Sequence, residues 1–236
     1  RRRKAHQRKF ALAAGGIVVT IAVLAWYFAY CIQRPEYALA QAVEAVAQHD
    51  LESFERRVNL TAVAEAGYDD LTYVLFARDT SLKEAERIAS GKFYEKIKGS
   101  VTEGLVRTIA YAVQHDVWTE PEGVDALKGR QLGIDFEYLM ECSHLRDTEL
   151  VAVGEIVRDG RAAVATVTVR DGGTGLEFPL QLRMEQGETG WQIVRVANYR
   201  AYLEVVQRAT GTDISRYIKA TRPIVDRYNS VFRSAQ

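Results

Sequence analysis

Residues 150–173 read LVAVGEIVRDGRAAVATVTVRDGG, and this stretch decides the fold. Apolar residues alternate with others on both sides of Asp159-Gly160, a dipeptide that is typical of a two-residue hairpin turn. In the first half we expect Val151 and Val153 to share one face, because successive side chains of a strand point to opposite sides. A glycine-rich turn closes the stretch. Residues 150–173 therefore predict two antiparallel strands of a larger sheet.

The sheet should continue as a meander over residues 148–198. The second strand should turn one apolar set inward: Ala163, Ala165, Val167 and Val169. The third strand should do the same with Leu176, Phe178, Leu180, Leu182 and Met184. Pro179 lies inside this third strand and predicts a sheet edge or a bulge there, because proline has no N–H to donate. Residues 191–196 should form the last strand, after a turn at Gly187–Gly190.

Helical periodicity occupies residues 35–130, before the sheet. Pro35 suits a first helical turn, and Asp50 is a good N-cap for a second short helix. A third helix is expected over about residues 60–76, and further helices over residues 199–233. Helices on both sides of one antiparallel meander indicate an α+β fold, in which the early helices cover the apolar face of the sheet.

The N-terminal part carries a different signal. From Phe10 to Gln33 there are twenty-four residues without a charge. A helix of roughly 20 apolar residues is long enough to cross a bilayer. We therefore expect residues 10–33 to form a transmembrane helix. Its apolar and aromatic anchor residues would be Ile17, Val18, Ile21, Leu24, Trp26, Tyr27 and Tyr30.

Three other interpretations of this segment compete with a permanent anchor. A cleavable signal peptide has an apolar region of only about 7–15 residues, which is shorter than this one. A lipoprotein signal would need a small residue before Cys31, where this chain has Tyr30. A buried core helix of this length should have a polar face. A single-pass anchor fits best, and cleavage stays open at this point.

Charge predicts the orientation. The head, residues 1–9, holds six basic residues and no acidic one, whereas the remainder has 25 basic and 31 acidic residues, a net charge of −6. An excess of Lys and Arg before a span places that side in the cytoplasm. Residues 34–236 should then form an extracytoplasmic domain. Its acidic balance argues against nucleic acid as a partner, so the expected partners are the lipid bilayer and a protein of the membrane or envelope.

Motifs with chemical content are sparse. Residues 141–144, Glu-Cys-Ser-His, offer a carboxylate, a thiol and an imidazole, and in a strand Cys142 and His144 would share a face. Zinc usually needs four ligands, and the chain has only two Cys and four His without paired spacing. We therefore expect no metal and no cofactor, and we assign no catalytic residue.

A tentative pocket can still be named. Asp135 and Glu137 lie in the stretch that leads to the sheet, and paired acids can act as general acid and base if one is desolvated. Tyr68, Tyr73 and Trp118 could line a cavity beside them. The alternatives are a solvated connector for the two acids and ordinary core packing for the three aromatic residues.

One resemblance gives the fold a more specific form. The early Tyr37-Ala38-Leu39 helix, the Asp50 and Phe54 of the next helix, and the Gly190-Trp191-Gln192-Ile193-Val194 strand resemble the NTF2-like superfamily. The nearest likeness is to bacterial, membrane-anchored, extracytoplasmic proteins of unknown function. The resemblance covers about residues 35–60 and 150–203. It implies a cone in which helices pack against a curved antiparallel sheet, and it implies no particular activity.

Two functions follow from these observations. The first is a non-enzymatic binding or assembly module of the cell envelope, such as an accessory subunit of a membrane complex. The second is a small hydrolase or isomerase that uses acids and tyrosines inside the cone. An enzyme should bring at least two titratable side chains together in a closed pocket. A binding module should show a dry cavity and an exposed apolar surface.

Overall fold

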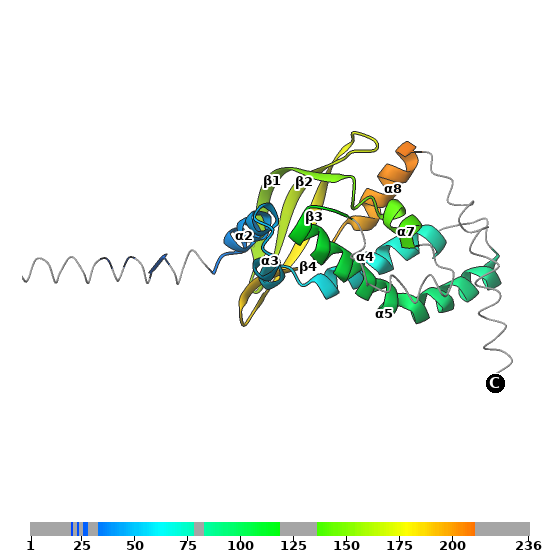
Figure 1. Ribbon diagram of the computed structural model, residues 1–236, viewed down its shortest axis with the longest axis horizontal. Helices are drawn as coiled ribbons and strands as arrows, with labels where there is room; N and C mark the ends of the chain where they lie inside the picture. The colour runs from blue at the N-terminus through cyan, green and yellow to red at the C-terminus, as the bar shows by residue number, and fades with distance from the viewer. Residues whose placement is uncertain are drawn as a thin grey trace, which may run out of the picture.

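The computed structural model describes residues 33–77, 83–118 and 136–210, together with Thr20, Val23, Trp26 and Tyr27. These residues form an α+β domain, as predicted, with helices packed on an antiparallel sheet (Figure 1). The basic head, most of the segment 10–33 and the helix predicted after residue 210 lie outside the described residues.

The described residues contain no helix that combines the length and the apolar character needed to cross a bilayer. Of the predicted anchor residues, Trp26 and Tyr27 are described; both are helical, with 62% and 47% of their surface exposed. The other anchor residues fall outside the described part: Ile17, Val18, Ile21, Leu24 and Tyr30.

The elements follow one another in the order that the sequence predicts, with helices first, the meander next and a helix last. The helices before the sheet are α2 (Pro35–Ala47), α3 (Leu51–Arg57), α4 (Leu60–Thr72), the π turn η1 (Tyr73–Ala77), α5 (Glu84–His115) and α7 (Phe136–Ser143). The strands are β1 (Thr148–Asp159), β2 (Ala162–Asp171), β3 (Glu177–Gly187) and β4 (Gly190–Val196), and α8 (Tyr199–Thr210) follows them.

The four strands pair in the order β1-β2-β3-β4, each antiparallel to the next. The predicted meander is therefore confirmed. The alternation of β2 is confirmed as well: Ala163 and Ala165 are buried and Val164 between them is exposed. Three register shifts interrupt the ladder, two in the pairing of β1 with β2 and one in the pairing of β3 with β4. Such irregularities bend and twist a sheet locally.

Pro179 lies in β3, opposite Thr168 of β2. The pairing of β3 with β4 extends only from Gly187 to Leu182, so at Pro179 the fourth strand has ended. The side chain of Asn198 takes its place, donating to the Pro179 carbonyl at 2.8 Å and accepting from the Gln181 amide at 2.8 Å. The predicted local edge is thus present, although β3 is an inner strand of the sheet.

The prediction for β1 is wrong in its faces. Leu150 lies opposite Val169, and Val153 lies opposite Val167, so both belong to the face that is buried in β2. The register shift between them inserts Val151 as an extra residue, and the simple alternation that the sequence suggests is lost.

One helix differs from the prediction: residues 136–143 form α7 in the stretch that leads to the sheet. Residues 84–115 form one continuous helix within the region that the sequence predicts to be helical. Figure 1 shows α5 extending past α4, with its last turn near α2 and α3. At that end the ring Nδ1 of His49 lies 3.1 Å from the Val113 carbonyl.

The core lies between the inner face of the sheet and the helices. Trp191 of β4 is 1% exposed, and Met184 and Leu203 are fully buried. The Trp191 indole N–H donates to the carbonyl of Gln33 at 2.8 Å. Pro35, two residues later, is also buried. The first helix of the domain is therefore joined to the sheet at its very beginning.

Candidate functional site

A cavity of about 80 Å³ lies among α4, α5, α7, α8 and β4. Helices α4 and α5 supply most of the lining residues, and α7, Leu145, Val196 of β4 and Tyr199 of α8 supply the others. The side chains that define it best are Ala64 and Tyr68 of α4, Leu105 and Ile109 of α5, Met140 of α7 and Tyr199 of α8. All of these belong to the helical side of the sheet, where the cone of the predicted fold would have its interior.

Helical spacing explains why these residues meet. Val101, Leu105 and Ile109 recur every four residues and so form one stripe along α5. On α4, Ala64 and Gly67 are small and leave room opposite that stripe. The cavity therefore arises where a row of branched side chains faces a row of small ones.

The polar atoms in the cavity wall already have partners. The Tyr68 hydroxyl donates to the Tyr94 carbonyl at 2.7 Å, and the Tyr199 hydroxyl donates to the Ser143 carbonyl at 2.7 Å. The Ser143 hydroxyl donates to the Met140 carbonyl at 2.6 Å. What remains for a ligand is an apolar surface.

Burial also fixes the ionisation of the two tyrosines. It raises the pKa of Tyr68 and that of Tyr199 far above the usual range for a phenol. Both side chains stay neutral at any physiological pH. Neither can act as a phenolate base towards a molecule in the cavity.

The residues of the tentative pocket do not gather in one place. Tyr68 lines the cavity. Tyr73 lies in η1, 44% exposed, with the Arg200 guanidinium 4.1 Å from its ring centre. Trp118 follows α5 and packs against the core from a half-buried position. Asp135 and the side chain of Glu137 lie outside the described residues. Sequence reasoning did not include the α5 stripe in the pocket, although its helical spacing indicated an inward-facing row.

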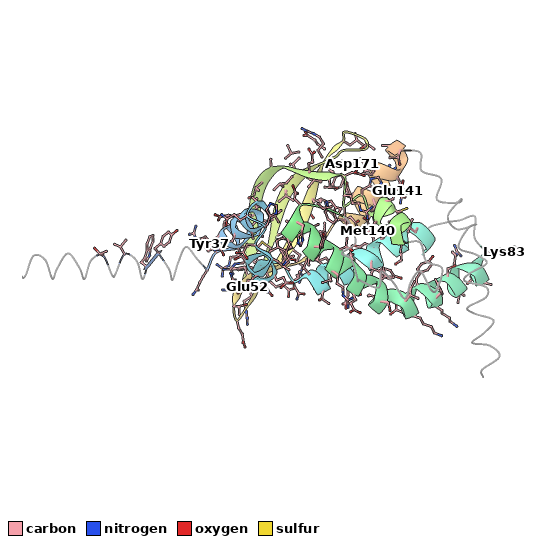
Figure 2. All side chains as sticks on the ribbon, in the orientation of Figure 1. Tyr37, Glu52, Lys83, Met140, Glu141 and Asp171 are labelled. Atoms are coloured by element: carbon pink, nitrogen blue, oxygen red, sulfur yellow. The ribbon has the colours of Figure 1, made fainter. Side chains whose placement is uncertain are left out.

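The Glu-Cys-Ser-His motif has a different role from the one its residue types suggest. Cys142 is a buried residue of α7, not of a strand, and His144 ends the helix with a φ of 54°. The His144 ring Nδ1 lies 3.0 Å from the carboxylate of Asp171, at the end of β2. Figure 2 shows Asp171 beside α7, which carries Met140 and Glu141. The described residues hold no group of three or more His, Cys, Asp or Glu that could bind a metal.

Asp171 is the centre of a closed polar network. Its side chain is fully buried, and it accepts hydrogen bonds from the amide and the hydroxyl of Thr174, at 2.8 and 2.6 Å. The Tyr202 hydroxyl lies 3.4 Å from the same carboxylate and 2.9 Å from the Thr148 hydroxyl. These contacts tie the turn after β2 to α8 and to the start of β1, which is a structural task.

Of these two features, the cavity is the one that offers room for another molecule. It can hold an apolar group, and its wall carries no ionised side chain among the residues that define it. A comparison of the chain with protein-family models finds no match, and a comparison with curated proteins finds none either.

Proposed function

We propose that this chain is a single-pass, membrane-anchored protein of the cell envelope with a non-enzymatic binding module outside the cytoplasm. Residues 10–33 would cross the bilayer with the basic head inside, and residues 34–236 would fold beyond it. The charge asymmetry of the sequence supports this orientation. The module would serve as an accessory subunit that presents or receives a ligand for a membrane complex.

The cavity is the observation that carries the proposal. Sites for small molecules are mostly apolar, with a few polar groups that fix orientation. Here the wall is apolar and its hydroxyls are engaged with backbone carbonyls. Burial of apolar surface away from water is favourable, so an apolar wall favours the entry of an apolar group. The ligand class that fits is therefore a hydrocarbon group, such as a segment of an acyl chain.

The finer fold proposal is an NTF2-like cone. It is supported by the four-stranded antiparallel sheet and by helices that bury the inner face of β2. It is also supported by the three register shifts, because bulges are the usual device by which a sheet acquires curvature. In such a cone the cavity between α4, α5 and α8 would be the interior.

The enzymatic alternative is a hydrolase or an isomerase. It would need a general acid or base that reaches the substrate. Tyr68 and Tyr199 are the titratable residues among the described cavity lining, and both are neutral and hydrogen-bonded. Binding without chemistry therefore agrees better with this wall.

An assembly role has its own supporting observation. Edge strand β1 exposes Leu150 and Val153, at 47% and 52%, on the face that is buried in β2. Exposed apolar groups on one face of an edge strand are typical of protein contact sites. The same module could hold an apolar ligand inside and a protein partner at this edge.

A photoactivatable fatty acid tests the binding proposal on the full-length protein in its membrane. Peptides that contain Leu105 and Met140 should be labelled, because both side chains line the cavity. Ala64→Leu should reduce that labelling at least about tenfold, since it fills the cavity, and it should cost about 1–3 kcal/mol of stability by overpacking. Ala40→Leu, at an exposed position of α2, is the matched control and should change neither.

Two results would contradict the proposal. One is labelling confined to the N-terminal segment in the wild-type protein, with none at Leu105 or Met140. The other is equal labelling of the wild type and of a folded Ala64→Leu variant, with the fold checked by circular dichroism.

A further inference from the structure

A cluster of charged residues lies where α4, β4 and α8 meet, one position along each element from a residue that lines the cavity. Its centre is Asp70, which is 1% exposed. The Arg195 guanidinium contacts the two oxygens of this carboxylate at 3.2 and 3.3 Å. The Arg200 Nε donates to one of the same oxygens at 2.5 Å. One buried carboxylate thus positions two guanidinium groups side by side.

The cluster has one positive charge too many. Arg195 and Arg200 share the single charge of Asp70, and each arginine side chain is 43% exposed. Arg183 lies directly opposite Arg195 in the sheet and has its own partner, Glu185, at 3.2 Å. Like charges opposite one another destabilise a sheet unless something compensates them. Another anion at this position would supply that compensation.

Several donors of the two guanidinium groups remain available. A guanidinium has five N–H donors, and Asp70 engages the Nε of Arg200 and one terminal nitrogen of Arg195. The Arg195 Nε is buried and has no acceptor among the described residues, so an anion from solvent would meet the terminal nitrogens of both groups. Buried polar groups that serve stability alone are usually all hydrogen-bonded, and the Arg195 guanidinium departs from that rule.

The two side chains are held in place before any ligand arrives. The Arg200 guanidinium lies over the Tyr73 ring, 4.1 Å from its centre, and this contact restricts it further. Arg200 is also in the first turn of α8, where the helix dipole favours a negative charge. Preorganised donors lose less entropy when they bind.

We propose that Arg195 and Arg200 form a binding site for a small tetrahedral oxyanion of the phosphate type. Two planar guanidinium forks can each take two oxygens of such an anion, which a single carboxylate offers to only one fork. Asp70 acts as the positioning residue behind them. The charged site and the apolar cavity use different side chains of the same elements, so phosphate binding does not depend on the ligand proposed for the cavity.

Inorganic phosphate is the probe, added to the purified full-length protein at constant ionic strength and followed by calorimetry. Binding is expected with a Kd in the range of about 10 μM to 1 mM. Arg195→Gln and Arg200→Gln should each weaken it at least about tenfold. Arg208→Gln is the matched control on the same helix, because Arg208 contacts only the Glu204 carbonyl among the described residues. It should bind phosphate as the wild type does.

The variant Asp70→Asn tests the positioning role of the buried carboxylate. If Asp70 holds the two guanidinium groups in place, calorimetry should show weaker phosphate binding to a folded Asp70→Asn variant than to the wild type, although both arginines are present. The proposal is overturned if the wild-type protein takes up no phosphate or if Arg208→Gln weakens binding as much as Arg200→Gln, and the positioning role is overturned if folded Asp70→Asn binds phosphate as tightly as the wild type.

Discussion

Asp171 shows how much a single buried carboxylate can organise. Its partners come from the turn after β2, from the end of α7 and from α8. Burial by itself would raise the pKa of Asp171. The hydroxyl and amide of Thr174, together with the His144 ring, outweigh that effect and hold the pKa below its usual value. The charged form is therefore favoured in the folded state.

This lowered pKa predicts a pH dependence of stability. A carboxyl group whose pKa is lower in the folded chain stabilises it above the unfolded-state value of about 4, and the effect is lost as the pH falls through the folded value. Unfolding by denaturant at pH 7 and at successively lower pH should show this loss in the wild type. Asp171→Asn should cost about 2–4 kcal/mol at pH 7, because it replaces a buried charged acceptor, and should flatten the profile below pH 5.

Asp159→Asn, at an exposed turn position, is the control for that experiment. It should leave both the stability at pH 7 and the acid limb of the profile close to those of the wild type. A profile for Asp171→Asn that is as steep as the wild-type one would show that other carboxyl groups cause the acid loss.

At the scale of elements, β1 is the unusual one. Val153 and Val167 are cross-strand partners on one face of the sheet, yet Val153 is 52% exposed and Val167 is 4% exposed. The helices cover the face at β2 and leave it bare at β1. An edge strand with an open apolar face invites pairing with another chain, and its two register shifts limit indiscriminate pairing.

The contrast gives a matched pair of substitutions. Val153→Lys should change the free energy of unfolding by no more than about 0.5 kcal/mol, because its side chain already meets solvent. Val167→Lys should cost more than about 4 kcal/mol, because it buries an unpaired charge. If β1 is the assembly surface, Val153→Lys should also abolish co-purification of the partner from native membranes. Equal destabilisation by both variants would mean that the β1 face is covered.

The sequence predicts those elements whose signal is local. Asp50 accepts from the Ser53 amide at 3.0 Å, as expected of an N-cap, and the hairpin at Asp159-Gly160 joins β1 to β2. Helix α7 was missed because eight residues are a short pattern, although Phe136, Leu139 and Met140 recur at helical spacing. Its stability comes from packing against the core. The faces of β1 were predicted wrongly because a bulge arises from the pairing of a strand with its neighbouring strand, which the sequence of β1 alone does not contain.

The candidate site was predictable only in part. Tyr68 was named from its aromatic character, and it does line the cavity. The spacing of Val101, Leu105 and Ile109 indicates one apolar face of a helix. That this face lies opposite Ala64 and Gly67 depends on the tertiary structure. The pairing of Asp70 with arginines more than 120 positions later could not be read from any local pattern.

For the whole molecule, the proposed orientation predicts which side of the membrane each end occupies. Thr189→Cys in the turn between β3 and β4, in a Cys31→Ser background, should react with a membrane-impermeant maleimide on intact spheroplasts. Cys142 is buried and should add little background. Lys4→Cys should react only after the membrane is permeabilised, because the basic head would face the cytoplasm. The reverse pattern, or labelling of both positions in intact spheroplasts, would rule the orientation out.

The hydrogen bond from the Trp191 indole to the Gln33 carbonyl has a mechanical consequence. If the segment that ends at Gln33 crosses the bilayer as proposed, no slack tether separates it from the folded body. A twist or tilt imposed on that segment by a neighbouring subunit would then act as a torque on β4 and, through Arg195 and Asp70, on α8. A movement of the membrane segment would in this way change the position of the charged residues at the other end of β4.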